Sequence, residues 1–211
     1  MGKILIINPN SAATVTEGIE AAVAPLGPHF EVTDIPHGPA TISSDEDVAR
    51  GGLNVLELAR MRPDARAIIT ACFSDPGLDL LRAELSIPVI GTQEAGILTA
   101  LARADNFGVI ALSKTSIPRH LRKIRAMGVE SRLTGELPLP GVSAEASGRD
   151  EAVYALVRDA AVQLGERGAG AIVLGCAGMA PIRARLERDT GLAIVDPVLA
   201  SAAMALGTVI G

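Results

Sequence analysis

Short apolar runs alternate with amphipathic segments along the whole sequence. The runs have strand length and are rich in Val, Ile, Leu and Ala, which predicts buried strands at residues 3–8, 30–34, 66–71, 87–91, 107–112, 129–133, 170–175 and 193–195. The segments between them predict helices at residues 12–24, 45–61, 76–83, 93–104, 117–127, 149–167, 179–189 and 197–209. Strands that alternate with helices indicate an α/β protein, with parallel sheets flanked by helices.

The second half of the sequence repeats the first at an offset of 103 to 105 residues. Ala67-Ile-Ile-Thr-Ala-Cys72 matches Ala171-Ile-Val-Leu-Gly-Cys176 at an offset of 104 residues. Any two α/β halves share apolar runs, but that does not readily explain a cysteine at the same strand end in both. We therefore expect two similar lobes, residues 1–98 and 99–198, related by a pseudo-two-fold axis with the active-site cleft between them. The last helix, about residues 199–211, is expected to pack back on the first lobe.

Composition narrows the class of protein. The chain has 211 residues, of which 48% are hydrophobic, but it has no Trp, one Tyr and three Phe, which fits an aliphatic core around parallel sheets. A net charge of −5 without a basic stripe argues against nucleic acid as a partner. The apolar runs are far shorter than the roughly 20 residues of a membrane span. The first strand begins almost at the N-terminus without a signal peptide before it, so we expect a soluble cytoplasmic protein that acts on a small molecule.

The sequence contains two cysteines, Cys72 and Cys176. They form no CxxC motif and have no clustered histidine partners, so a structural zinc site is not expected. A disulfide between them is disfavoured in a reducing cytosol. The sequence has neither a GxGxxG motif nor a phosphate-binding loop, so nucleotide binding is not supported.

The paired cysteines predict a two-base site. Ligands of open α/β sheets lie beyond the carboxyl ends of the strands, so facing lobes would bring Cys72 and Cys176 to one ligand from opposite sides. Racemisation without a cofactor needs a base on one face of a carbon and an acid on the other. A thiol with a reference pKa near ~8.5 can serve in either state near neutral pH, and free amides and a helix dipole at each strand end favour the thiolate. A lone cysteine is more often a core residue, and the equivalent positions of these two are what favour catalysis.

Residues that follow the same strand ends are the candidate substrate contacts. They supply hydroxyls, an amide, backbone N–H groups and small side chains that permit a close approach to the ligand. The candidates are Asn10, Ser11, Phe73, Ser74, Ser113, Thr115, Ala177, Gly178 and Met179. Asn10 and Ser11 could equally cap the first helix, and Ser74 with Asp75 could cap a helix that starts at Pro76.

The remaining titratable residues of interest have simpler interpretations. Asp45, Glu46 and Asp47 are expected to begin a helix, and Glu94 to lie in the first turn of another. His37 is expected in a loop near the mouth of the cleft. Arg119 and His120 could touch a substrate carboxylate, but a solvated helix face is the favoured interpretation.

The motifs together resemble the Asp/Glu racemase superfamily, and within it the hydantoin racemase and allantoin racemase branch. They are Ile7-Asn-Pro-Asn-Ser11, Ala71-Cys-Phe-Ser-Asp-Pro-Gly-Leu78, Pro88-Val-Ile-Gly-Thr-Gln-Glu-Ala95, Leu174-Gly-Cys-Ala-Gly-Met179 and Val195-Asp-Pro-Val198. The resemblance implies a two-lobed fold that uses no metal, pyridoxal phosphate or nucleotide, and a homo-oligomer. It implies that Cys72 and Cys176 are the acid/base pair, and that Asn10, Ser74 and the backbone of residues 176–179 contact the substrate.

Two segments depart from the hydantoin racemase pattern. Ala111-Leu112 stands where that branch tends to have a Thr-Thr pair, and Gly38-Pro-Ala-Thr-Ile-Ser43 lacks the Glu that often ends this loop. Both segments are expected to line the cleft, so the substrate stays open.

Three classes of function remain. The first is racemisation of a hydantoin, allantoin or a related amino-acid derivative, with free aspartate or glutamate as an alternative that would need a cation in the cleft. The second is another reaction on the same fold, such as that of a maleate isomerase or an arylmalonate decarboxylase. The third is a binding module without turnover, in which paired cysteines would have no purpose.

Overall fold

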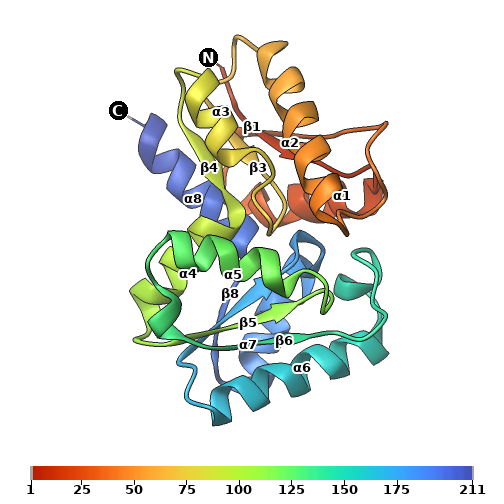
Figure 1. The fold of residues 1–211 in the computed structure, drawn as a ribbon, viewed down its shortest axis with the longest axis vertical. Coiled ribbons are helices and arrows are strands. Elements are labelled where there is room, and N and C mark those ends of the chain that lie inside the picture. The colour runs from red at the N-terminus through yellow and green to blue at the C-terminus, as the bar shows by residue number, and fades with distance from the viewer. Residues whose placement is uncertain (1, 211) are drawn as a thin grey trace.

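The computed structural model describes residues 2–210, which form two four-stranded parallel sheets (Figure 1). The first sheet has the order β2-β1-β3-β4 and the second the order β6-β5-β7-β8, so the two lobes have the same topology. This confirms the predicted α/β fold with two similar lobes. The strands are β1 (Ile4–Asn8), β2 (Phe30–Asp34), β3 (Ala67–Thr70), β4 (Val89–Gly91), β5 (Phe107–Ala111), β6 (Leu133–Pro138), β7 (Ala171–Gly175) and β8 (Ala193–Val195).

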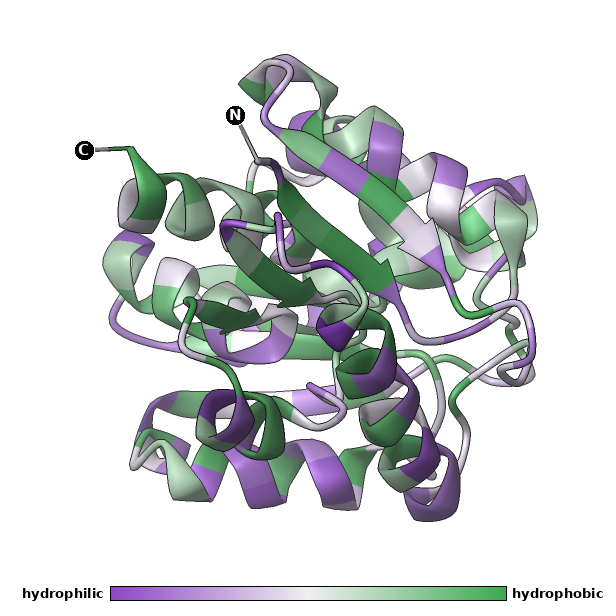
Figure 2. Cartoon of the chain, turned by 90° about the horizontal axis from the view of Figure 1, so that it is seen from above, coloured by the Kyte–Doolittle hydropathy of each residue, from purple (hydrophilic) through white to green (hydrophobic). Residues whose placement is uncertain are grey.

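Helices cover both faces of each sheet. They are α1 (Ala13–Val23), α2 (Asp45–Arg60), α3 (Leu78–Glu84), α4 (Thr92–Arg103), α5 (Ile117–Ala126), α6 (Glu151–Glu166), α7 (Arg183–Thr190) and α8 (Pro197–Val209). In β1, Leu5 and Ile7 pack into one core, while Ile4 and Ile6 pack into a second core that both lobes share. Both faces of β1 are therefore buried, and this is why β1 is continuously apolar from Ile4 to Ile7; in Figure 2 it is the green strand that begins beside the N-terminus.

Helices α4 and α8 join the lobes. In Figure 1, α4 lies with the lower lobe, whereas α8 lies beside β4 in the upper lobe. The two helices pack against each other, and Gly96 permits the close approach because a Cβ there would lie 2.9 Å from the Cβ of Pro197. Arg103 of α4 donates to the carbonyl of Ile194 in the second lobe. The expected lobe boundary at residue 98 falls inside α4.

Three predicted elements differ from the structure. The strand predicted at 129–133 is wrong, because residues 130–132 form a 3-10 turn and β6 begins at Leu133, where pairing with β5 sets its position. The helix predicted at 76–83 begins two residues later, after Gly77 in a left-handed conformation (φ 71°). The helix predicted at 179–189 is split, because Pro181 lies in a 3-10 helix over residues 177–182 that precedes α7.

The predicted start of α2 is confirmed. Asp45, Glu46 and Asp47 occupy its first turn, and Ser44 is its N-cap in a capping box with Asp47. Across residues 2–210, none of the helices combines the length and the apolar character that crossing a bilayer requires.

Candidate active site

The two cysteines lie at corresponding ends of corresponding strands. Cys72 follows β3 after one intervening residue, Cys176 follows β7 directly, and each strand is third in the order of its sheet. Both side chains line one pocket between the lobes, which has about 460 Å³ of empty space including its opening to solvent. Its other lining residues are Asn10, Val15, Thr41, Ile42, Ala71, Phe73, Ser74, Leu112, Ser116, Arg119, His120, Ala144, Gly175 and Ala177. Both cysteines are free and only partly buried.

Cys176 is surrounded by hydrogen-bond donors. The backbone N–H groups of Gly178 and Met179 both favour the thiolate, although that of Met179 donates to the carbonyl of Cys176 at 3.1 Å. The hydroxyl of Ser147 can also donate to this sulfur, or to the carbonyl of Ala144 at 2.7 Å. Removal from water nevertheless dominates and raises the pKa of the Cys176 thiol above its ordinary value.

The Cys72 thiol has different neighbours. Burial raises the pKa of its thiol to about 12, and the neighbouring Cys176 adds to the rise. The backbone N–H of Ser74 and the charge of Arg119 act in the opposite direction. No helix begins directly at Cys72, since α3 starts at Leu78, so the expected helix dipole is not available there. Amides assist both thiolates as expected, but burial outweighs this assistance.

Asn10 presents an amide to the pocket. It is nearly buried, and its Oδ1 accepts from the Nδ2 of Asn8 at 3.0 Å and from the backbone N–H of Ala12 at 2.9 Å. These bonds fix the side chain, and within residues 2–210 its Nδ2 donates no hydrogen bond. The N-cap of α1 is Ala12, so Asn10 forms the turn before the helix and keeps a donor available.

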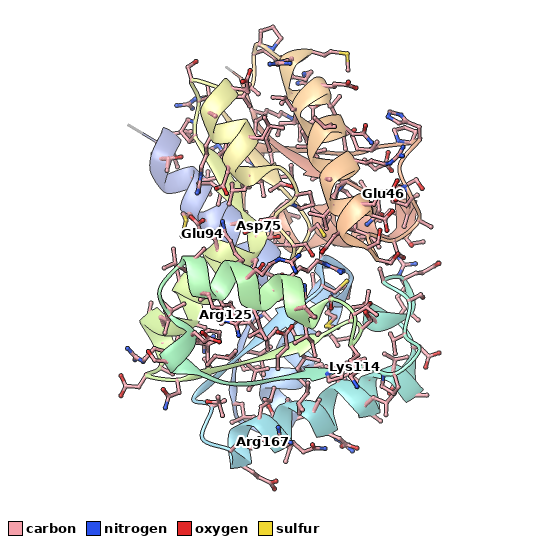
Figure 3. All side chains as sticks on the ribbon, viewed as in Figure 1. Glu46, Asp75, Glu94, Lys114, Arg125 and Arg167 are labelled. Carbon is pink, nitrogen blue, oxygen red and sulfur yellow. The ribbon has the colours of Figure 1, made fainter. Side chains whose placement is uncertain are left out.

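Asp75 connects the loop that carries Cys72 to the start of α4. It has φ 44°, lies nearly buried where the lobes meet (Figure 3), and accepts from the backbone N–H of Gln93 at 2.8 Å and of Glu94 at 3.1 Å. Asp75 is therefore a cap, but of α4 rather than of the helix that follows it, which corrects the sequence-based interpretation. Burial raises the pKa of its carboxyl to about 6.

Arg119 reaches from α5 of the second lobe to residues of the first. Its Nε donates to the Ser74 hydroxyl at 2.9 Å, and its Nη atoms donate to the carbonyls of Ile42 and Ser43, each at 3.3 Å. The residue is only half-buried, but it lines the pocket beside Cys72. The expectation of a solvated helix face is thus wrong for Arg119, because the first turns of α5 point into the cleft.

The same expectation is wrong for His120, which is 2% exposed. Its Nδ1 lies 2.5 Å from an oxygen of Glu136, whose side chain is also 2% exposed. The ring stands edge-on to Phe73, with 4.9 Å between ring centres. This buried pair fixes one wall of the pocket. Glu94, by contrast, lies in the first turn of α4 as expected and pairs with Arg82 and Lys123 outside the pocket.

Comparison with known proteins identifies the family. The family model for Asp/Glu/hydantoin racemases matches residues 4–205. The chain belongs to this family. A hydantoin racemase from Paenarthrobacter aurescens is 33% identical, with 96% of this chain and 89% of that protein covered. An allantoin racemase from Klebsiella pneumoniae has a structure similar to this one, with a TM-score of 0.89 and 29% identity over 100% of this chain and 88% of that one.

A more distant neighbour shares the fold alone. Glutamate racemase RacE1 from Bacillus anthracis superposes with a TM-score of 0.68 at 18% identity, over 99% of this chain and 81% of that one. The family and its relatives support racemase activity for this chain.

The expected contact residues divide into two groups. Asn10, Phe73, Ser74 and Ala177 line the pocket together with both cysteines. The others lie outside its lining. Ser113 and Thr115 bond each other through their hydroxyls at 2.7 Å, and Ser11 donates its backbone N–H to the carbonyl of Pro39. Gly178 and Met179 stand behind Cys176 and reach it through their N–H groups, and His37 is exposed outside the pocket.

Part of the wall was not expected from the sequence, which favoured a solvated helix face for Arg119 and His120. Ser116, Arg119 and His120 come from the start of α5, and Ala144 comes from the loop after β6. A signal for the first three was present, because α5 follows the carboxyl end of β5, where ligands of such sheets bind. Ala144 had no local signal. Among residues 2–210, no three His, Cys, Asp or Glu side chains converge as a metal site would require.

Proposed function

We propose that the protein is a cofactor-independent racemase that acts on the acidic ring carbon of a hydantoin or allantoin. The observation that carries the proposal is that Cys72 and Cys176 enter one pocket from two lobes of the same topology. The relatives named above support this substrate class. The pocket is small and partly apolar, with Val15, Ile42 and Leu112 in its wall, which suits a five-membered ring with a small substituent.

In the proposed reaction one cysteine is a thiolate and the other a thiol. The thiolate removes the proton from C5 of the ring, and the electron pair left on carbon delocalises into the adjacent carbonyl as an enolate. The opposite thiol then donates its proton to the other face of C5, which inverts the carbon and leaves the cysteines in exchanged states. The opposite enantiomer reacts in reverse, so no oxidant or cofactor is consumed.

The surrounding residues support this charge movement. The free Nδ2 of Asn10 is a fixed donor that can stabilise the enolate oxygen, since Asn8 and Ala12 hold the other end of the amide. Thiols with raised pKa values give strongly basic thiolates, but only a small fraction of each thiol is ionised at neutral pH. A ring carbon acidified by flanking carbonyl and amide groups lowers the demand on such a base.

Arg119 favours one second candidate, the racemisation of free aspartate or glutamate. A cation in the cleft is what a free amino acid requires, and the guanidinium lines the pocket beside Cys72. The Cα proton of a free amino acid is much less acidic, so the hydantoin class remains the first proposal.

The proposal is tested in D2O with single enantiomers of 5-substituted hydantoins, allantoin, aspartate and glutamate. Optical rotation follows inversion, and proton NMR follows loss of the C5 or Cα proton. We expect both enantiomers of at least one hydantoin or of allantoin to lose rotation and gain one deuterium. Turnover of the free amino acids alone would support the second candidate, and exchange on none of these compounds would reject both.

The rate is expected to rise with pH. Burial raises the pKa of both thiols, to about 12 for Cys72, so the reactive form with one thiolate is a minor species at neutral pH. Its fraction grows by about tenfold per pH unit while the pH stays below the lower of the two pKa values. Deuterium exchange under kcat/KM conditions should therefore climb with a slope near one from pH 6.5 to 8.5, in parallel with alkylation by iodoacetamide. A plateau already at pH 7 in both measurements would contradict a raised pKa.

A further inference from the structure

Arg119 carries a charge that the folded chain does not neutralise. Its four hydrogen bonds go to the Ser74 hydroxyl and to the carbonyls of Ile42, Ser43 and Thr115, all of which are neutral acceptors. A guanidinium has five N–H groups, so one remains, on Nη2. Within residues 2–210 no carboxylate pairs with this guanidinium.

The neighbouring cations on α5 are different. Arg122 pairs with Asp45 at 2.8 Å, and Lys123 pairs with Glu94 at 3.3 Å. Neither residue lines the pocket that holds the cysteines. Of these three cations, Arg119 is therefore the one that has no carboxylate partner and also lines the pocket. An anion in the pocket would stabilise this partly desolvated guanidinium, so the wall that carries Arg119 is complementary to an anion.

The position of the guanidinium restricts where that anion can be. It donates a hydrogen bond to Ser74, two residues from Cys72, and its charge lowers the pKa of the Cys72 thiol. The reacting carbon must lie between the two thiols, so a group bound by Arg119 is attached to that carbon through a short chain. Ile42 and Leu112 also line the pocket and add apolar surface to it.

We infer that Arg119 forms a carboxylate subsite, and that the preferred substrates are hydantoins whose C5 substituent is short and ends in a carboxylate. Such compounds are the hydantoin derivatives of aspartate and glutamate. The inference rests on the proposed racemase function and specifies its substrate class. Arg119 is thereby a specificity-determining residue that contacts the substituent and leaves the proton transfers to the cysteines.

The test compares an acid with its neutral isostere. Hydantoin-5-acetic acid and hydantoin-5-acetamide differ in charge but hardly in shape, so the ratio of their kcat/KM values isolates the charge. We expect the wild-type protein to prefer the acid by about 10- to 100-fold, the range for one charge-assisted hydrogen bond. Arg119→Gln should bring the ratio near one through a higher KM for the acid, and Arg119→Lys should retain part of the preference.

Arg122→Gln is the matched control, because it removes a cation of the same helix, and this cation does not line the pocket. It should keep the wild-type ratio of kcat/KM values for acid and amide. Any effect of Arg119 on the Cys72 thiolate cancels in the ratio, because both substrates use the same thiols. If Arg119 instead stabilised the enolate, Arg119→Gln would lower kcat equally for acid and amide, and that outcome overturns the inference.

The comparison within the wild-type protein does not depend on any variant folding correctly. A wild-type ratio near or below one rejects the subsite while leaving the racemase proposal intact. Loss of the proposed function has a different signature, because neither compound would then exchange its C5 proton. Calorimetric binding of the acid and the amide to wild type and Arg119→Gln tests the subsite independently of turnover, with equal affinities in wild type as the contradicting result.

Discussion

Cys72→Ser and Cys176→Ser are each expected to lower the racemisation rate by about 1,000-fold, because each removes one member of the acid/base pair and a serine hydroxyl ionises far too weakly to replace it. Each variant should still exchange the C5 proton of one enantiomer, because the remaining thiolate reaches one face of the ring. The two variants should select opposite enantiomers. Optical rotation and proton NMR in D2O measure the two effects separately.

The two variants are controls for each other. Both remove one sulfur from the same pocket, so a general loss of folding would abolish exchange on both enantiomers, and circular dichroism would show it. Racemisation at the wild-type rate in both variants would reject the two-base mechanism. Exchange by only one variant would assign the whole chemistry to a single cysteine, as in a one-base reaction.

Asp75→Ala is expected to lower the free energy of unfolding by about 2–4 kcal/mol. The substitution leaves the backbone N–H groups of Gln93 and Glu94 without their acceptor at the buried start of α4. Asp75→Asn keeps one acceptor oxygen and should lose less than half as much. Urea unfolding followed by circular dichroism measures both changes, since the chain has no tryptophan to report them.

Asp79→Ala is the matched control for this prediction. Asp79 is an exposed carboxylate in the first turn of α3, close in sequence to Asp75, and its removal should change the stability by less than about 1 kcal/mol. Equal stability of Asp75→Ala and wild type would show that the capping bonds contribute nothing to the fold.

The capping of α4 shows how the two halves have diverged. Asp196 caps α8 through the backbone N–H of Val198 at 2.9 Å, and the equivalent position before α4 is Gly91, which has no side chain. Asp75 supplies the missing carboxylate from another loop. The loop that carries Cys72 is thereby fixed to the helix that covers the second sheet. The geometry of one thiol and the joining of the lobes thus depend on the same side chain.

The two thiols have also diverged. The pKa of Cys176 is lowered by the Gly178 and Met179 N–H groups and the Ser147 hydroxyl, whereas that of Cys72 is lowered by the Ser74 N–H and the charge of Arg119. The Cys72 side is therefore the side on which the charge of Arg119 would bind a charged substituent. This asymmetry gives a physical reason for kcat and KM each to differ between the two enantiomers, although their ratio kcat/KM is the same for both because the equilibrium constant of racemisation is one.

The sequence by itself determined the architecture and the two thiols. Continuous apolar runs report strands that are buried on both faces, and the repeat at 104 residues places Cys72 and Cys176 at equivalent strand ends. These features are local, or they follow from comparing one half of the chain with the other. The same local signals failed at β6, whose sequence Leu-Thr-Gly-Glu-Leu-Pro is a weak strand former and is positioned by pairing with β5.

Only the tertiary structure decided which other side chains meet the thiols. Helical periodicity indicates that α5 has an exposed and a buried face, but not that its first turns close a cleft against another lobe. The sequence therefore favoured surface positions for Arg119 and His120. Their partners, the Ile42 carbonyl and Glu136, lie in distant parts of the chain and are brought to α5 only by the tertiary structure. The crossing of α4 and α8 is of the same kind, since contacts between distant segments leave no periodic signal in either one.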